Sequence, residues 1–106
     1  MPIDIVVLYD TPEDPEAFDR HFRDVHLPIV RTIPGLLEFE TSRGTVGVEG
    51  GAPCHQMARL RFASHEALQA ALDSDAGHAA RADLANFAQA GVALITVDVE
   101  PVGVPR

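Results

Sequence analysis

The sequence contains no lysine and a single cysteine, and each shortage excludes a class of chemistry. Schiff-base catalysis needs a primary amine side chain, so a chain without lysine cannot use it. The lone Cys54 cannot form a disulfide within the chain, so its presence does not indicate an oxidising compartment. Long apolar runs and a basic, signal-like N-terminal segment are also absent. We therefore expect a cytoplasmic protein.

Positive charge is also scarce. The sequence has 8 basic residues, all arginines, against 16 acidic ones, and its formal net charge at pH 7 is −8. Phosphate backbones and anionic lipid head groups repel such a chain, so we predict neither nucleic acid nor a membrane surface as a partner.

The 106 residues suffice for one domain. A domain of this size buries only about two-thirds of its unfolded surface, so a deep pocket often needs walls from a second subunit.

Sequence motifs for cofactors are missing as well. No glycine-rich phosphate loop stands between a strand and a helix, and neither GxSxG nor CxxC occurs. The neighbours Cys54 and His55 do not make a metal site by themselves, and no other spacing supports one. We therefore predict that the protein uses neither a cofactor nor a metal.

Four segments have the character of β-strands. Residues 3–9 are rich in β-branched and aromatic types, and both faces of this segment are apolar, which is typical of a central strand. The other predicted strands span residues 36–43, 55–62 and 92–100. With two helices between them, the order βαββαβ predicts a single α+β domain of the ferredoxin-like type over residues 1–106. In this fold both helices cover one face of a four-stranded antiparallel sheet.

The first predicted helix runs from Pro15 to about Val30. Asp14 is typical of an N-cap, and proline suits the first helical position. Pro28 lacks the N–H that would continue the helix and its ring crowds the preceding turn, so we predict a kink or an early end near residues 25–28.

The second predicted helix runs from Glu66 to about Ala90 and is interrupted at residues 73–75. Gly91 is typical of the residue that follows a helix C-terminus. The glycine-rich residues 44–53 indicate a long loop between the second and third strands.

The sheet face without helices is predicted to be mixed in character. If the second and third strands pair as a hairpin, one register sets Glu38 opposite Arg61 and Glu40 opposite Arg59, and opposite charges across strands are favourable. The same face is predicted to carry Val6, Leu8, Met57 and Thr96. Such a face is too apolar to leave bare, which favours burial in a two-fold homodimer. The alternative is a solvated face with surface ion pairs.

His26 is the main candidate for chemistry. It lies beside the predicted kink at Pro28, at the border of an apolar helical stripe. That stripe consists of Phe18, Phe22, Val25 and Ile29. A half-buried imidazole titrates near neutrality and can act as an acid or a base. The alternative is a structural histidine that bonds a helix carbonyl freed by Pro28.

His21, His65 and His78 are predicted to lie at the surface. Tyr9 ends the first strand, where its hydroxyl can meet a ligand or sit at the rim of the core.

Several runs of the sequence are similar to the EthD family. They are Tyr9, the run Pro-Glu-Asp-Pro-Glu-Ala-Phe-Asp at residues 12–19, His26-Leu-Pro28, Pro34-Gly35-Leu36, and Asp83-Leu84-Ala85-Asn86-Phe87 with Gly91 after it. The resemblance covers nearly the whole chain. It implies a dimeric α+β barrel, in which two ferredoxin-like sheets pack face to face. Many related sequences carry a Tyr-Tyr pair where this chain has His21 and Phe22.

The resemblance also implies a role. The founding member is linked to breakdown of ethyl tert-butyl ether alongside a cytochrome P450 system, and the family label is that of an oxidoreductase. We therefore expect a small-molecule-binding protein of catabolic or secondary metabolism that acts without a cofactor on a small apolar or aromatic compound. His26 is the candidate catalytic residue, and the candidate substrate-binding residues are Tyr9, Phe22 and Arg59. The alternatives are an accessory module that holds a ligand for a partner oxygenase, and haem binding with His26 as axial ligand.

Overall fold

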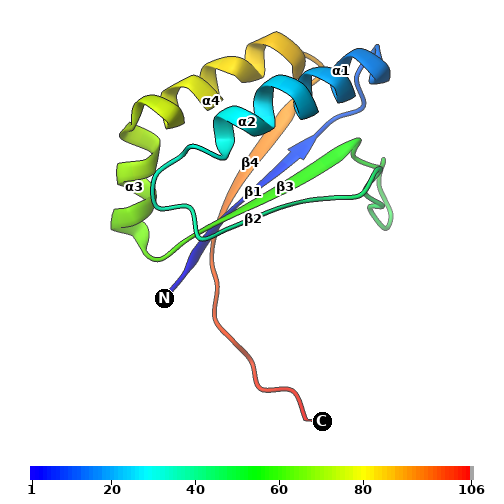
Figure 1. The fold of residues 1–106 in the computed structure, drawn as a ribbon. Helices are drawn as coiled ribbons and strands as arrows, with labels where there is room; N and C mark the ends of the chain where they lie inside the picture. Colours follow the sequence, from blue (N-terminus) through cyan, green and yellow to red (C-terminus); the bar gives the residue numbers. More distant parts are fainter. Residues whose placement is uncertain (106) are drawn as a thin grey trace.

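The computed structural model describes residues 1–105 and has a layer of helices on one face of a four-stranded antiparallel sheet (Figure 1). The strands are β1 (Ile3–Tyr9), β2 (Glu38–Thr41), β3 (Gln56–Phe62) and β4 (Val92–Asp98), in the spatial order β2-β3-β1-β4. This arrangement confirms the predicted ferredoxin-like fold. The second strand is shorter than predicted at both ends. Within the described residues, no helix combines the length and the apolar character that a bilayer crossing requires.

The first predicted helix consists of three segments. These are α1 (Pro15–His21), the π-helical turn η1 (Phe22–His26) and α2 (Leu27–Val30). The Asp14 side chain caps α1 by accepting a hydrogen bond from the backbone N–H of Ala17 at 3.1 Å. The predicted kink is therefore a widened turn that ends two residues before Pro28. The change of hydrogen-bond spacing in this turn accommodates a proline, which has no N–H to donate.

The second predicted helix is divided at Ser74 into α3 (His65–Asp73) and α4 (Asp75–Phe87). The Ser74 hydroxyl donates to the carbonyl of Ala71 at 2.6 Å and accepts from the N–H of Gly77 at 3.0 Å, so one side chain ends one helix and begins the next. The second helix ends at Phe87 rather than near Ala90.

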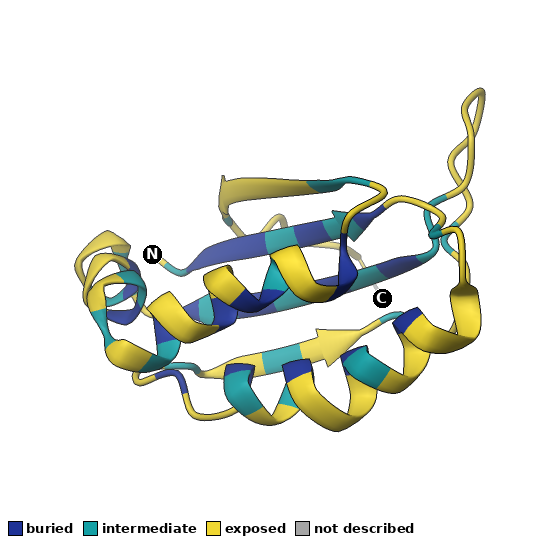
Figure 2. Ribbon diagram, turned by 90° about the horizontal axis from the view of Figure 1, so that it is seen from above, coloured by how far each residue is buried: buried dark blue, intermediate teal, exposed yellow. Residues whose placement is uncertain are grey.

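The face of the sheet that meets the helices is apolar. The side chains of β1 that face the helix layer are buried, and they are Ile3, Ile5, Val7 and Tyr9. Figure 2 shows buried residues on the strands that lie beneath the helices. Residues directly opposite in neighbouring strands share a face. Thr96 pairs with Ile5 and therefore lies on the helix side, which corrects its predicted place on the other face. Ile95, which pairs with Val6, lies on the helix-free face instead.

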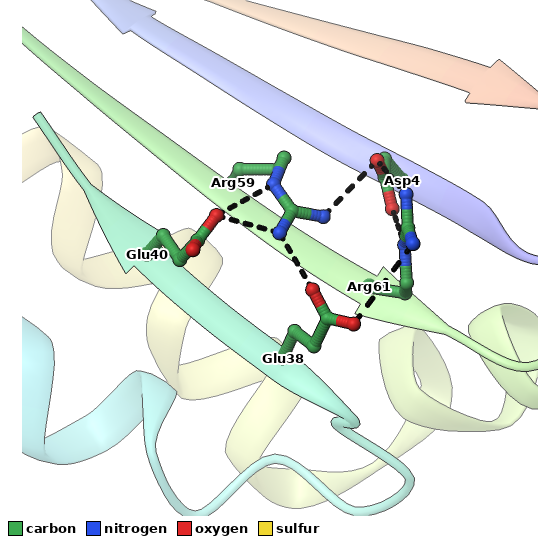
Figure 3. A network of polar contacts seen from close by, with 5 residues as sticks. All are labelled: Asp4, Glu38, Glu40, Arg59 and Arg61. Carbon is green, nitrogen blue, oxygen red and sulfur yellow. Dashed lines mark hydrogen bonds and ion pairs between the residues drawn. The ribbon is translucent and has the colours of Figure 1, made fainter. Parts of the chain in front are cut away.

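The helix-free face carries a network of charged side chains (Figure 3). The predicted register is confirmed: Glu38 lies opposite Arg61, and Glu40 lies opposite Arg59. Arg59 donates to Glu38 at 2.7 Å and to Glu40 at 2.6 Å, while both arginines also donate to Asp4. The hydrogen bonds from Arg61, followed by those from Arg59, hold the pKa of the buried Asp4 below its usual value, although burial opposes them. The charges on both arginines are thus matched by carboxylates within the sheet.

The junction between α3 and α4 requires a glycine. A Cβ atom at Gly77 would overlap the backbone carbonyl oxygen of Ala71. We expect Gly77→Ala to lower the free energy of unfolding by about 1–3 kcal/mol, because the two helices must separate to admit the methyl group. Urea unfolding measures this loss. Gly47→Ala is the control, since nothing lies within 4 Å of a Cβ built there. Equal stabilities for the two variants would contradict the close packing described.

Candidate functional site

A cavity of about 70 Å³ lies between the helix layer and the sheet. Its walls are almost wholly hydrocarbon, supplied mainly by β1, β3, α2 and α4. The polar side chains among the lining residues are Tyr9, His26 and Arg81. An apolar cavity of about 150 Å³ accepts benzene in another protein, so this one admits an apolar group of only a few heavy atoms unless its walls move apart.

His26 is more deeply buried than its position in the sequence predicts. Its exposed fraction is 5%, whereas Val25, predicted to face inward, is 41% exposed. The π turn explains this exchange, because the additional residue in η1 rotates the following side chains by one position. The buried positions of the segment are consequently four residues apart, at Phe18, Phe22, His26 and Val30.

Asp83 of α4 contacts the imidazole of His26. The distance between Nδ1 of His26 and Oδ2 of Asp83 is 2.9 Å, and Asp83 is only 6% exposed. Burial lowers the pKa of His26, and the nearby carboxylate offsets this only in part, so the imidazole is neutral at pH 7. A neutral imidazole beside a carboxylate donates from the nitrogen that faces it. Nδ1 therefore carries the proton, and Nε2 is left with a lone pair.

The carboxylate of Asp83 has two further partners. His21 places its Nε2 at 2.9 Å from Oδ1 and 3.1 Å from Oδ2, and Asn86 donates to Oδ1 at 3.0 Å. Burial alone would raise the pKa of Asp83, but the hydrogen bonds from Asn86, His21 and His26 hold it below its usual value. Asp83 is therefore ionised. His21 is partly buried and stacks on Phe87 at 5.0 Å between ring centroids, rather than lying free on the surface as predicted.

Asp83 was not identified as a site residue from the sequence. A usable signal was present, since Asp83 stands between Ala80 and Phe87 at spacings of three and four residues, on the apolar stripe of α4. A charged residue on a buried stripe is rarely unpartnered.

Two of the predicted substrate-binding residues lie beside His26. Tyr9 is 1% exposed and meets Phe22 edge-on at 5.5 Å, while Phe22 stacks on His26 at 6.1 Å. Burial and the negative charge of Asp83 raise the pKa of Tyr9, so its phenol keeps its proton. Both residues line the cavity.

Arg59 is not part of this site. It pairs with Val6 on the helix-free face of the sheet, where its guanidinium is engaged with Glu38, Glu40 and Asp4. The hairpin register predicted from the sequence already placed Arg59 on this face, in conflict with its predicted binding role, and the structure confirms the register.

The other histidines form separate pairs or stand alone at the surface. His55 contacts Asp19 at 2.8 Å, and His65 contacts Asp98 at 2.6 Å. Across residues 1–105, no three His, Cys, Asp or Glu side chains are arranged to hold a metal ion. A haem does not fit beside His26, because a porphyrin is far larger than the cavity.

The neutral state of His26 makes stability depend on pH. Because the pKa of His26 is lower in the folded protein than its unfolded value of about 6.5, the unfolded chain binds the proton first on acidification. We expect this contribution to be complete above about pH 6.5 and to be lost as the pH falls towards the folded-state pKa. Urea unfolding between pH 7.5 and about 5 measures the slope.

His26→Gln is expected to flatten this part of the stability profile. His65→Gln is the matched control, because His65 is exposed and makes its contact with Asp98 at the surface. The interpretation fails if His26→Gln and the unmodified protein lose stability in parallel over this range.

Comparison with known proteins identifies relatives over most of the chain. The EthD domain matches residues 10–91. An uncharacterized 11.0 kDa protein from the thcB-thcC intergenic region of Rhodococcus erythropolis is 35% identical over 99 residues, which are 92% of this chain and 95% of that protein.

Solved structures share the fold. An ethyl tert-butyl ether D (EthD) family protein from Bacillus halodurans superposes with a TM-score of 0.85 at 32% identity, covering 94% of this chain and 100% of the other. A dimeric ferredoxin-like protein of unknown function from Jannaschia has a TM-score of 0.72 at 19% identity, covering 93% of this chain and 100% of the other. The domain match and the two relatives above 30% identity together show that the chain belongs to the EthD family.

Proposed function

We propose that this protein binds a small, largely apolar molecule in the cavity and that His26 transfers a proton to or from it. The supporting observation is the contact between the neutral imidazole of His26 and the ionised Asp83 at the edge of a hydrocarbon-lined space. A general base needs a fixed orientation and an accessible lone pair. The hydrogen bond between Asp83 and Nδ1 supplies the fixed orientation, and Nε2 supplies the lone pair.

The chemistry of this arrangement is a proton transfer that requires no other group. Nε2 of His26 accepts a proton from a C–H or O–H group of the ligand, and the resulting imidazolium is stabilised by the negative charge of Asp83. His26 then returns a proton, either the same one or one exchanged with water, to the ligand and ends neutral. Tyr9 adds a protonated phenol as a hydrogen-bond donor on the same cavity.

Membership of the EthD family supports a role in catabolic or secondary metabolism, next to an oxidative degradation pathway. The family takes its name from ethyl tert-butyl ether, a largely apolar compound that matches the hydrocarbon lining of the cavity in polarity and would enter it only if the walls moved apart. This class of ligand fits the residues around His26 better than a nucleotide or a sugar, because the walls offer few hydrogen-bonding groups.

A second candidate function is non-catalytic. The small volume of the cavity and the low exposure of His26 also suit an accessory module that shelters a ligand for a partner oxygenase. The two functions differ in one respect: a catalyst exchanges protons with the bound compound, whereas a sequestering module only binds it.

Replacement of Asp83 tests the catalytic proposal. In Asp83→Asn the amide can donate to Nδ1 of His26, which moves the imidazole proton to Nε2 and removes the base. We expect deuterium incorporation from D₂O into acetone, a ketone small enough for the cavity, to fall by about 100-fold or more when followed by NMR, the usual contribution of a general base. Ketone binding measured on the same sample is expected to change little.

Asp24→Asn is the matched control, because Asp24 lies exposed on η1 and its carboxylate pairs with the neighbouring Arg23. Exchange as fast in Asp83→Asn as in the control would remove His26 and Asp83 from the mechanism. Binding without exchange in the unmodified protein would favour the accessory module.

We also propose that the protein forms a homodimer through its helix-free sheet face. Beside the charged network, this face presents apolar side chains, which are Val6, Leu8, Met57 and Ile95. The Jannaschia protein of the same fold is described as dimeric. Packing two such faces together removes their apolar surface from water, and it would form the predicted dimeric α+β barrel.

Light scattering at micromolar concentration is expected to give the mass of a dimer. Leu8→Arg is expected to shift the protein to a monomer, because the change puts an unpaired charge among the apolar side chains of this face. Ala82→Arg, on the exposed surface of α4, is expected to leave the dimer intact. A monomeric unmodified protein would exclude this assembly.

A further inference from the structure

The cavity has an uneven distribution of charge. Arg81 of α4 is a lining residue, whereas no aspartate or glutamate lines the same space. This is unexpected in a chain with 16 acidic and 8 basic residues. Arg81 lies one helical turn from both Gly77 and Leu84, which line the cavity with it, so its hydrocarbon stem borders the apolar wall while its side chain reaches solvent.

The guanidinium of Arg81 forms no ion pair with any residue in 1–105, in contrast to Arg59 and Arg61 in the sheet. Arg81 also borders an outer groove that includes Asp73. The carboxylate of Asp73 accepts hydrogen bonds from Gln69 at 3.2 and 3.3 Å. The donors of Arg81 are consequently available to a ligand, and a guanidinium binds a carboxylate through two parallel hydrogen bonds.

The edge of the cavity near β4 is open to water. Leu94 of β4 lines the cavity and is nevertheless 48% exposed. Arg81 and His26 both line this cavity, so a molecule that enters it can set a polar end against Arg81 and place its apolar end in the space that His26 borders. A ligand that contacts both a charged group and an apolar interior must have one polar end and one apolar end.

We propose that the ligand of this cavity is a small amphipathic anion, with a carboxylate or an equivalent oxyanion on Arg81 and a short hydrocarbon body towards His26. This inference rests on the proposed function, because it names the class of molecule that the His26 cavity holds. In a protein of net charge −8, an anion is repelled at long range, so its recognition depends on a local cation such as Arg81.

A pair of probes of the same shape tests this inference. Isovalerate carries a carboxylate, and isovaleramide replaces it with a neutral amide. We expect isovalerate to bind the unmodified protein about tenfold more tightly at pH 7.5, which corresponds to about 1.4 kcal/mol. Titration followed by the NMR signal of the His26 ring shows that each compound occupies the cavity.

The preference for the anion is expected to disappear in Arg81→Gln. Arg31→Gln is the matched control, because Arg31 is also exposed and without an ion pair in residues 1–105, but lines a different groove. Arg31→Gln is expected to keep the preference. A higher salt concentration is expected to reduce the preference in both the unmodified protein and this control.

Two results would overturn the inference: equal binding of the two probes by the unmodified protein, or a preference retained in Arg81→Gln. In either case, binding that shifts the His26 signal leaves the proposed function standing, because the cavity then accepts the hydrocarbon body whatever its head group. If neither probe binds at millimolar concentration, the inference and the proposed function both fail.

Discussion

The buried carboxylate of Asp83 is the interaction on which the candidate site depends. A charge removed from water is costly unless hydrogen bonds replace its hydration, and Asp83 has three partners, which are His21, His26 and Asn86. His21 lies in α1 and His26 in η1, so the same carboxylate joins α4 to both of these segments. By accepting from Nδ1 of His26, it also fixes Nε2 as the imidazole nitrogen that keeps its lone pair.

The π turn provides the second requirement of the site. A regular α-helix from Pro15 to Val30 would bury Val25 and leave His26 at the border of its apolar face. The additional residue in η1 turns His26 inward, towards Asp83 and the cavity, and exposes Val25 instead. Such single widened turns often occur at functional positions of helices. The irregularity near Pro28 thus sets the position of His26 rather than only ending a helix.

The two faces of the sheet serve different purposes. The face beneath the helices forms the apolar wall of the cavity, whereas the opposite face pairs Arg59 and Arg61 with Asp4, Glu38 and Glu40. Those arginines are therefore committed to the sheet, and the cation that can meet a ligand at the cavity is Arg81. A homodimer built on the helix-free face would leave this rim accessible, because Arg81 lies in the helix layer on the other side of the sheet.

The sequence alone determined the features that depend on residues close together along the chain. Alternation of apolar and charged types in β2 and β3 set the pairing of Glu38 with Arg61, and Asp14 and Pro28 marked the start and the irregularity of the first helix. Only the tertiary structure decided the rest. Asp83 meets His26 and His21 across 57 and 62 residues of sequence, and the face on which Thr96 lies depends on the register of β4 against β1. A shift of one residue in that register exchanges the two faces, and no local pattern in the chain fixes it.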